Sequence, residues 1–143
     1  MNTISKIIHW GDTHHPGWMD GLRILLGLIL FIKGVQFAGD PKGLYQVLEG
    51  HDLTLYSFFL VNYIAMAHLA GGVLIILGLL TRITILFQLP ILLGAVIFNG
   101  MSTGILDFYS EFYLSLFTLG MLVLFLVYGS GPVSIDEHIK RNP

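Results

Sequence analysis

The sequence predicts an all-α membrane protein, a bundle of four transmembrane helices with short amphipathic N-terminal and C-terminal segments. Hydrophobic residues make up 55% and charged residues 11% of the 143 residues, whereas a soluble domain carries about 25% charged residues. The apolar residues gather into long runs, and about 20 such residues form a helix that crosses the ~30 Å hydrocarbon core of a lipid bilayer. One compact bundle uses the whole length, so we expect a single membrane domain over residues 1–143.

The four spans are predicted at residues 18–37, 55–80, 83–100 and 109–129. The first opens with Trp18 and ends near Gly39-Asp40-Pro41, a combination that stops helices. Thr81-Arg82 forms a tight turn between the second and third spans. The fourth closes with Gly129-Ser130-Gly131-Pro132, a second helix stop.

Three short helices are predicted outside the spans. Near the N-terminus, an apolar stripe indicates a helix at the membrane interface rather than a cleavable signal; it consists of Ile4, Ile7, Ile8 and Trp10. Residues 44–49 lie between Gly43 and Gly50 and are expected to form one or two turns on the membrane surface. Ser134, followed three residues later by Glu137, matches a capping box and predicts a short helix after the fourth span.

The distribution of basic residues predicts the orientation. Lys6, Arg82, Lys140 and Arg141 fall on one side of the predicted bundle, and only Lys42 falls in a loop on the other side. Because basic loops stay in the cytoplasm, both termini are expected there, and the loop over residues 40–54 is expected to face outward.

Composition excludes several function classes. A net charge of −2 gives no reason to expect nucleic acid as a partner. Without cysteine there is no disulfide, no Cys-ligated zinc and no Cys-ligated iron–sulfur cluster. Haem held by two histidines is not expected, because His68 is the one histidine inside the predicted spans, and the adjacent His14 and His15 do not converge on one metal ion. Any redox chemistry must therefore belong to a bound small molecule or to a partner.

Ionisable residues inside the apolar runs are the main functional signal. Arg23 and Lys33 lie in the first span, His68 near the middle of the second, and Glu111 at the start of the fourth. A charged side chain at a helix centre costs at least ~2.5 kcal/mol on insertion scales, so such residues usually have a partner or a function.

Depth along the helices groups these residues with other polar side chains. A ligand pocket is predicted in the outer half of the bundle, built from Lys33, Gln36, Asn62, Asn99, Asp107 and Glu111. Lys33 and Glu111 are candidates for a structural ion pair or for a ligand or proton site. His68 is either a neutral imidazole bonded within the bundle or a proton carrier.

Arg23 lies deeper toward the cytoplasmic side, and its role is left open. Four roles are possible for this side chain. It can extend to the membrane interface, form an ion pair with Asp20 or Asp136, donate hydrogen bonds to carbonyls of the tail, or contact a ligand. Small residues such as Gly27, Gly34 and the 71–72 pair indicate closely packed helices.

The chain resembles the DoxX family of small bacterial membrane proteins. The resemblance is carried by three segments in order: Arg23-x-x-x-Gly27-x-x-x-Phe31-x-x-Gly34, Gly71-Gly72-x-Leu74-x-x-x-Gly78-Leu79-x-Thr81-Arg82, and Glu111 with Gly129-x-Gly131-Pro132-x-Ser134-x-Asp136. It implies a four-helix bundle in the bacterial inner membrane. An acidic residue is frequent in the family at the position of His68. Because imidazole also titrates, a histidine at this position can still carry a proton, but it cannot supply a fixed negative charge.

Similarity to this family also implies a function, because DoxX-like proteins include membrane subunits of thiosulfate:quinone oxidoreductase. We therefore expect a quinone-linked redox subunit or accessory protein, in which Glu111 and His68 relay protons and Lys33 or Arg23 stabilises negative charge on the reduced quinone. A protein partner would supply electrons, docking at the tail or the outer loop. The alternatives are a non-catalytic scaffold or assembly partner and, ranked last, a small-molecule carrier; a homo-oligomer is compatible with each.

Overall fold

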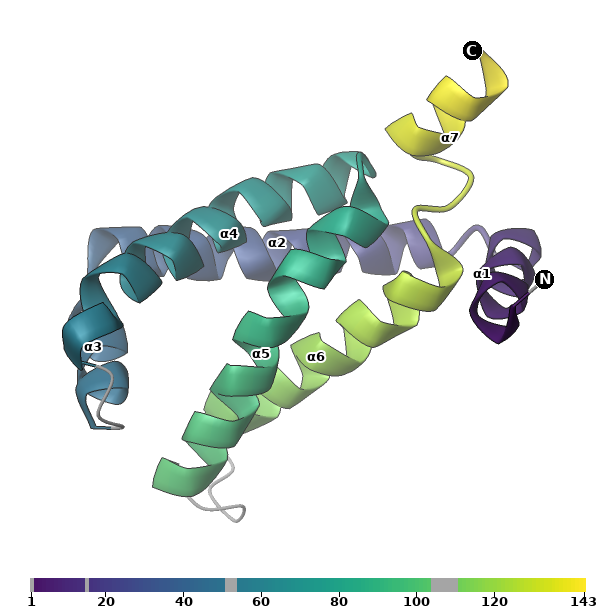
Figure 1. Cartoon of the computed structure of the whole chain (residues 1–143). Helices are drawn as coiled ribbons and strands as arrows, with labels where there is room; N and C mark the ends of the chain where they lie inside the picture. Colours follow the sequence, from purple (N-terminus) through teal and green to yellow (C-terminus); the bar gives the residue numbers. More distant parts are fainter. Residues whose placement is uncertain (1, 15, 51–53, 104–110) are drawn as a thin grey trace.

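The computed structural model describes residues 2–14, 16–50, 54–103 and 111–143, and every regular element among them is helical (Figure 1). In chain order the elements are α1 (Thr3–Thr13), α2 (Met19–Gly39), α3 (Lys42–Glu49), the 3₁₀ turn η1 (Thr54–Tyr56), α4 (Ser57–Leu77), α5 (Thr81–Thr103), α6 (Glu111–Tyr128) and α7 (Ile135–Arg141).

Four of these helices correspond to the predicted spans. In the described part of the chain, α2, α4 and α5 are long and apolar enough to cross a membrane, and α6 contains a shorter apolar stretch, Phe112–Tyr128. The prediction of an all-α membrane bundle is confirmed. The prediction that Thr81-Arg82 form the turn between the second and third spans is wrong, because both residues lie in the first turn of α5. The turn comes earlier, at residues 78–80, where Gly78 caps α4 with a φ of +67°, a left-handed conformation that suits glycine.

Small residues bring α2 and α4 into close contact. A Cβ atom added at Gly27 would lie 2.8 Å from the Gly72 carbonyl oxygen, and one added at Gly72 would lie 2.7 Å from the Phe31 backbone nitrogen. Gly34 is similarly close, since its added Cβ would lie 2.7 Å from the Leu69 nitrogen. Backbone contact of this kind is how membrane helices associate without a hydrophobic driving force.

The second pair, α5 and α6, packs through larger side chains. Ile85 on α5 and Leu122 and Phe125 on α6 have no exposed surface, and they join Leu26 and Ile75 of the first pair in one core. This shared core lies toward the end of the bundle that carries α1 and α7.

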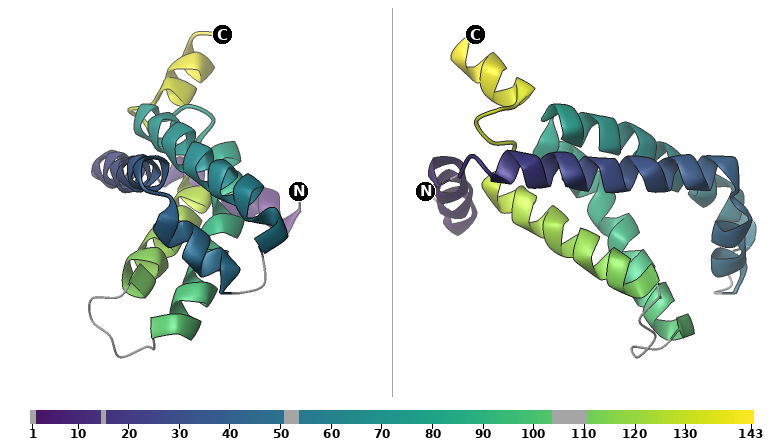
Figure 2. Two further views of the ribbon diagram at one scale, coloured as in Figure 1. Left: turned by 90° about the vertical axis from the view of Figure 1, so that its left-hand side faces the viewer. Right: turned by 180° about the vertical axis from the view of Figure 1, so that it is seen from behind.

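The two helix pairs meet at the α1/α7 end and diverge toward α3. Figure 1 shows α2 beside α4 and α5 beside α6, and both views in Figure 2 show the second pair leaving the first at an angle. Both chain ends lie at the α1/α7 end (Figure 1). The divergence matters for function because it leaves space between the pairs toward α3.

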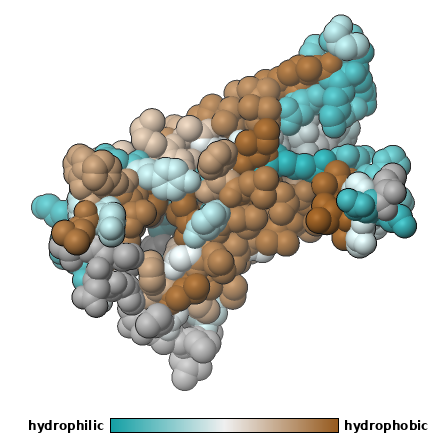
Figure 3. Space-filling model, viewed as in Figure 1, coloured by the Kyte–Doolittle hydropathy of each residue, from teal (hydrophilic) through white to brown (hydrophobic). Residues whose placement is uncertain are grey.

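The outer surface of the spans is apolar. Large side chains that are about half exposed or more occur on each of them, for example Ile32, Phe59, Phe87 and Phe117. Figure 3 shows hydrophobic side chains over α4, α5 and α6, with hydrophilic ones gathered on α7. A soluble protein rarely exposes apolar patches of this extent, whereas a bilayer covers them.

The three short helices predicted for the flanking segments are present, whereas their position relative to the membrane surface stays a prediction. α1 packs its Gly11 against the end of α6, where an added Cβ would clash with the Val127 carbonyl. α3 follows Pro41 and covers the predicted residues 44–49. In α7 the Ser134 hydroxyl accepts a hydrogen bond from the Glu137 backbone N–H at 3.2 Å, as the capping box predicts.

Candidate functional site

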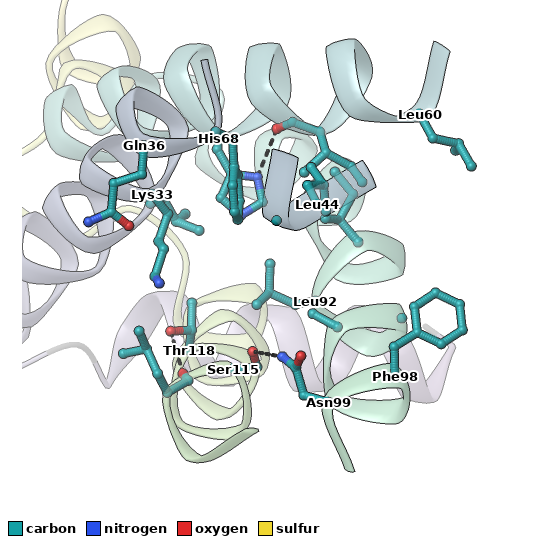
Figure 4. Close-up of a pocket in the computed structure, with 18 of the residues that line it drawn as sticks. Lys33, Gln36, Leu44, Leu60, His68, Leu92, Phe98, Asn99, Ser115 and Thr118 are labelled. Carbon is teal, nitrogen blue, oxygen red and sulfur yellow. Dashed lines mark hydrogen bonds between the residues drawn. The ribbon is translucent and has the colours of Figure 1, made fainter. Parts of the chain in front are cut away.

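A cavity of about 970 Å³ lies between the two helix pairs, in the half of the bundle toward α3 (Figure 4). It takes side chains from α2, α3, α4, α5 and α6. Its polar lining residues include Lys33, Gln36, His68, Asn99, Ser115 and Thr118. Ligand pockets in proteins typically span 300–1,000 Å³, so the space is large enough for a small organic molecule.

His68 forms one wall of the cavity. The residue is 4% exposed, and its Nδ1 lies 2.9 Å from the Ile64 carbonyl oxygen one turn earlier on α4. A carbonyl only accepts hydrogen bonds, so Nδ1 carries the hydrogen, and Nε2 of the neutral ring is an acceptor. The Phe37 ring meets the imidazole edge-on, with 5.4 Å between ring centroids, and helps to fix its orientation.

Lys33 enters the cavity from α2. Figure 4 shows its side chain pointing across the space toward the side of α6 that carries Thr118. Gln36, one turn later on α2, is exposed and lies at the edge of the cavity. The ammonium group thus lies in a mainly apolar space, where its charge acts more strongly than in water.

The opposite wall carries hydroxyl and amide groups from α5 and α6. The Asn99 side-chain nitrogen donates to the Ser115 hydroxyl at 3.2 Å, and the Thr118 hydroxyl donates to the Leu114 carbonyl at 2.8 Å. Ser115 is 8% and Thr118 2% exposed. Neither was among the predicted site residues, although the signal was present: they follow Glu111 by four and seven residues, a helical spacing for one face.

Most of the remaining lining is apolar, apart from Asp40 and Tyr63. Leu30, Phe37 and Ile64 contribute from the first pair, and Leu92 and Phe98 from α5. Leu44 and Leu48 of α3 also line the cavity. The surface helix predicted for the outer loop is therefore part of the site, which its sequence did not reveal.

Four predicted site residues do not lie in the described lining: Asn62, Asp107, Glu111 and Arg23. Asn62 is exposed on α4, where its amide donates to the Phe58 carbonyl at 2.8 Å, and it does not line the cavity. Asp107 lies outside the described residues. Glu111 begins α6, but its side chain is also outside the described part, so its predicted pairing with Lys33 stays a prediction.

Arg23 lies away from the cavity, at the α1/α7 end. It is 2% exposed, pairs with Asp20 at 2.8 Å, and donates to the carbonyls of Ser130 and Val133, the latter at 2.8 Å. It also reaches the Ile76 carbonyl at 3.5 Å. Of the roles left open from the sequence, pairing with Asp20 and bonding to tail carbonyls are the ones observed.

Two further motif residues hold the same end of the bundle together. The Asp136 carboxylate accepts hydrogen bonds from the backbone N–H groups of Leu80 and Thr81, at 2.9 and 3.2 Å, and so caps the start of α5. Arg82 donates to the Leu126 and Val127 carbonyls at the end of α6. These motif residues therefore connect helix ends rather than line the cavity.

The described residues contain no group of three or more His, Cys, Asp or Glu side chains that could hold a metal ion. The described lining of the cavity instead suits a largely apolar organic ligand with polar groups, since apolar walls surround a few hydrogen-bonding groups, the Lys33 side chain and the Asp40 side chain.

Comparison with known proteins gives one match. The family model for DoxX matches residues 19–100, which run from the start of α2 into the last part of α5. No curated protein and no solved structure is similar enough to count as a match.

Proposed function

The chain belongs to the DoxX family, and from this premise we propose that it is a membrane protein that binds a quinone between its helix pairs. In this proposal it serves as a quinone-linked subunit or accessory protein of an oxidoreductase complex in the bacterial inner membrane. A protein partner supplies the electrons, because a chain without cysteine has no thiolate or Cys-ligated cluster of its own.

The observation that carries the proposal is the combination of apolar and polar walls in the cavity. A quinone ring is flat and apolar, with an oxygen acceptor at each of two opposite edges. His68 and Lys33 line one side of the space and the Asn99–Ser115 pair lines the other, and apolar side chains such as Leu92 complete the walls. Donors on both sides of an apolar slot match the two oxygens of such a ring.

Each polar group has a separate role in the proposal. The bound quinone supplies the redox chemistry that the protein's own side chains lack. Lys33 favours negative charge on a ring oxygen, and His68 takes up or releases a proton at Nε2. Glu111 is retained as a second proposed proton carrier. Arg23 has no part in ligand binding, because its guanidinium is used to hold the tail.

The test is to purify the protein in mild detergent, extract it with organic solvent and measure quinone by mass spectrometry. The chain offers a matched pair of variants, Asn99→Leu inside the cavity and Asn62→Leu outside it. We expect near-stoichiometric quinone in the wild type and in Asn62→Leu, and a large loss in Asn99→Leu and Lys33→Met. Well-folded wild-type protein without quinone would contradict the proposal.

A scaffold function is the second candidate, and the tail favours it. Two apolar side chains of this segment are exposed: Val133, just before α7, at 71%, and Ile139, on α7, at 54%. The segment bonds to the bundle mainly through its backbone and Asp136. A partner that co-purifies in fixed ratio with the full chain, and is lost in Ile139→Asp, would support this candidate. Quinone bound to protein that is purified without any partner would instead favour the quinone-binding function.

A further inference from the structure

α5 carries a row of buried polar side chains that the cavity does not use. Between Thr81 and Gly100 it has five buried residues, and three of them, Thr81, Thr84 and Gln88, are polar. They are spaced by three and four residues, so they lie on one face at intervals of ~4.5 and ~6 Å along the axis. Burying hydroxyl and amide groups on the core face of an apolar membrane helix is costly unless they are hydrogen-bonded, so such residues usually have a partner or a function.

Two atoms of this row, Thr81 Oγ1 and Gln88 Oε1, lack hydrogen-bond partners among the described residues, and so do Asp20 Oδ2 and Arg23 Nε on the neighbouring helix α2. A buried polar atom left unpaired costs about 1–3 kcal/mol, and internal water commonly removes that cost. These unpaired atoms include both hydrogen-bond donors and acceptors, so a water molecule can accept a bond from one of them and donate a bond to another.

The row starts at a second cavity. This cavity of about 380 Å³ lies at the α1/α7 end and is lined by Thr81 together with charged side chains, including Arg82, Asp136 and Lys140. Arg23 is close to the same place, since an added Cβ at Gly78 would lie 3.1 Å from its guanidinium carbon.

The row ends beside His68. The Gln88 side-chain nitrogen donates to the carbonyl of Ala67, the residue directly before His68. Gly71 allows this approach, because an added Cβ there would lie 2.3 Å from that nitrogen and 3.3 Å from the Thr84 methyl carbon. Thr84 and Gln88 thus lie against the same glycine, one turn of α4 beyond Ala67.

We propose that Thr81, Thr84 and Gln88, with Arg23 at the entrance, form a hydrated path through which protons from the α1/α7 side reach His68. The path deepens the proposed function and rests on it, because protons are needed where a quinone is reduced. The proton passes from bulk water along hydrogen-bonded water and is taken up by His68 Nε2. Electrons follow a separate route from the partner.

The absence of cysteine allows a direct test of hydration. Thr81→Cys and Thr84→Cys are nearly isosteric probes, and Ile85→Cys is the matched control, because Ile85 is fully buried on the same helix. A thiol reacts as its thiolate, which needs water, so we expect a small methanethiosulfonate to modify positions 81 and 84 at least about tenfold faster than position 85. Equal rates at positions 84 and 85 would overturn the path.

A second measurement follows proton delivery itself. In protein labelled with ¹⁵N-histidine, nuclear magnetic resonance reports how fast the His68 ring protons exchange with water. Gln88→Met should slow this exchange at least about tenfold by breaking the chain of polar groups, whereas Asn62→Leu, outside the cavity on α4, should not. Unchanged exchange in Gln88→Met would mean that protons reach His68 from the α3 side.

Both measurements use protein without added quinone, so they separate the two proposals. Purified protein without quinone would contradict the proposed function even if the path is hydrated. A path without water would contradict the inference even if quinone binds.

Discussion

Arg23 shows how a charge can be accommodated inside a membrane protein without a ligand. It lies on a spanning helix with 2% of its surface exposed, and its donors reach Asp20 and the backbone carbonyls of the segment after α6. Those carbonyls lie beyond a helix end, where no intrahelical donor serves them. The residue thus joins α2 to the tail and satisfies groups that would otherwise be unpaired in an apolar environment.

Replacing Arg23 should be strongly destabilising. Arg23→Met leaves the Asp20 carboxylate buried without a partner, and breaking a buried pair in this way costs about 3–5 kcal/mol. The matched control is Arg141→Met, whose exposed pair with Glu137 at 3.2 Å contributes less than about 1 kcal/mol. Unfolding by SDS titration, followed by circular dichroism, measures both. Similar midpoints for the two variants would show that the Arg23 contacts do not hold the fold.

Individual residues were predicted unevenly from the sequence. The positions of Arg23 and His68 within spans followed from hydropathy, but the burial of Arg23 did not, since snorkelling was left open; Lys33, Gln36 and Asn99 do line one cavity. Asn62 does not line it, because the rotation of a helix about its axis decides which side chains face the cavity. A helix that is apolar on all sides, with polar residues on several faces, has no sequence period from which that rotation can be predicted. Ser115 and Thr118 were missed because hydroxyl groups are common in membrane helices.

At the scale of elements, glycine contacts decide how the first pair forms. The Gly27 and Gly72 backbones touch, so a side chain at either position must push α2 and α4 apart. We expect Gly27→Leu to cost about 1–3 kcal/mol through overpacking. Gly120→Leu on α6 is the control, since an added Cβ there meets nothing within 4 Å. The same SDS titration applies, and equal stability of both variants would contradict close packing of this pair.

The cap on α5 gives a second prediction for an element. Asp136 accepts bonds from two backbone N–H groups of the α4–α5 turn, so Asp136→Ala should destabilise the protein by about 0.5–2 kcal/mol. The change should also speed hydrogen exchange at Leu80 and Thr81, as measured by mass spectrometry. In Glu137→Ala, which alters only α7 and its exposed pair with Arg141, exchange at those residues should stay slow.

The existence of the elements was readily predicted, because long apolar runs, helix stops and a capping box are local signals. The spans expected at residues 18–37 and 109–129 correspond to Met19–Gly39 and Glu111–Tyr128. Their arrangement into two diverging pairs was not predicted. It depends on contacts between distant residues, such as Gly27 with Gly72, that no local pattern specifies.

For the whole molecule, the orientation is the open prediction. Both termini lie at one end (Figure 1), which requires an even number of spans, yet α6 has 18 residues and is ~27 Å long, close to the ~30 Å hydrocarbon core. We expect green fluorescent protein to be fluorescent, and alkaline phosphatase inactive, when fused to either terminus. An active phosphatase at the C-terminus alone would mean that α6 does not cross.

The divergence of the two pairs is the feature on which the functional account depends. The α1/α7 end is held by Arg23, Arg82 and Asp136, whereas the α3 end contains the cavity. Rigid contacts at one end and a lined space at the other give the bundle a defined site without a large domain.

The most direct test of that account is cross-linking with a photoreactive quinone, followed by mapping of the modified peptides. The account predicts modification of peptides from α2, α5 and α6 that include Lys33, Asn99 or Ser115, with competition by unlabelled quinone. Labelling confined to the lipid-facing residues, or unaffected by competitor, would contradict a quinone site between the helix pairs.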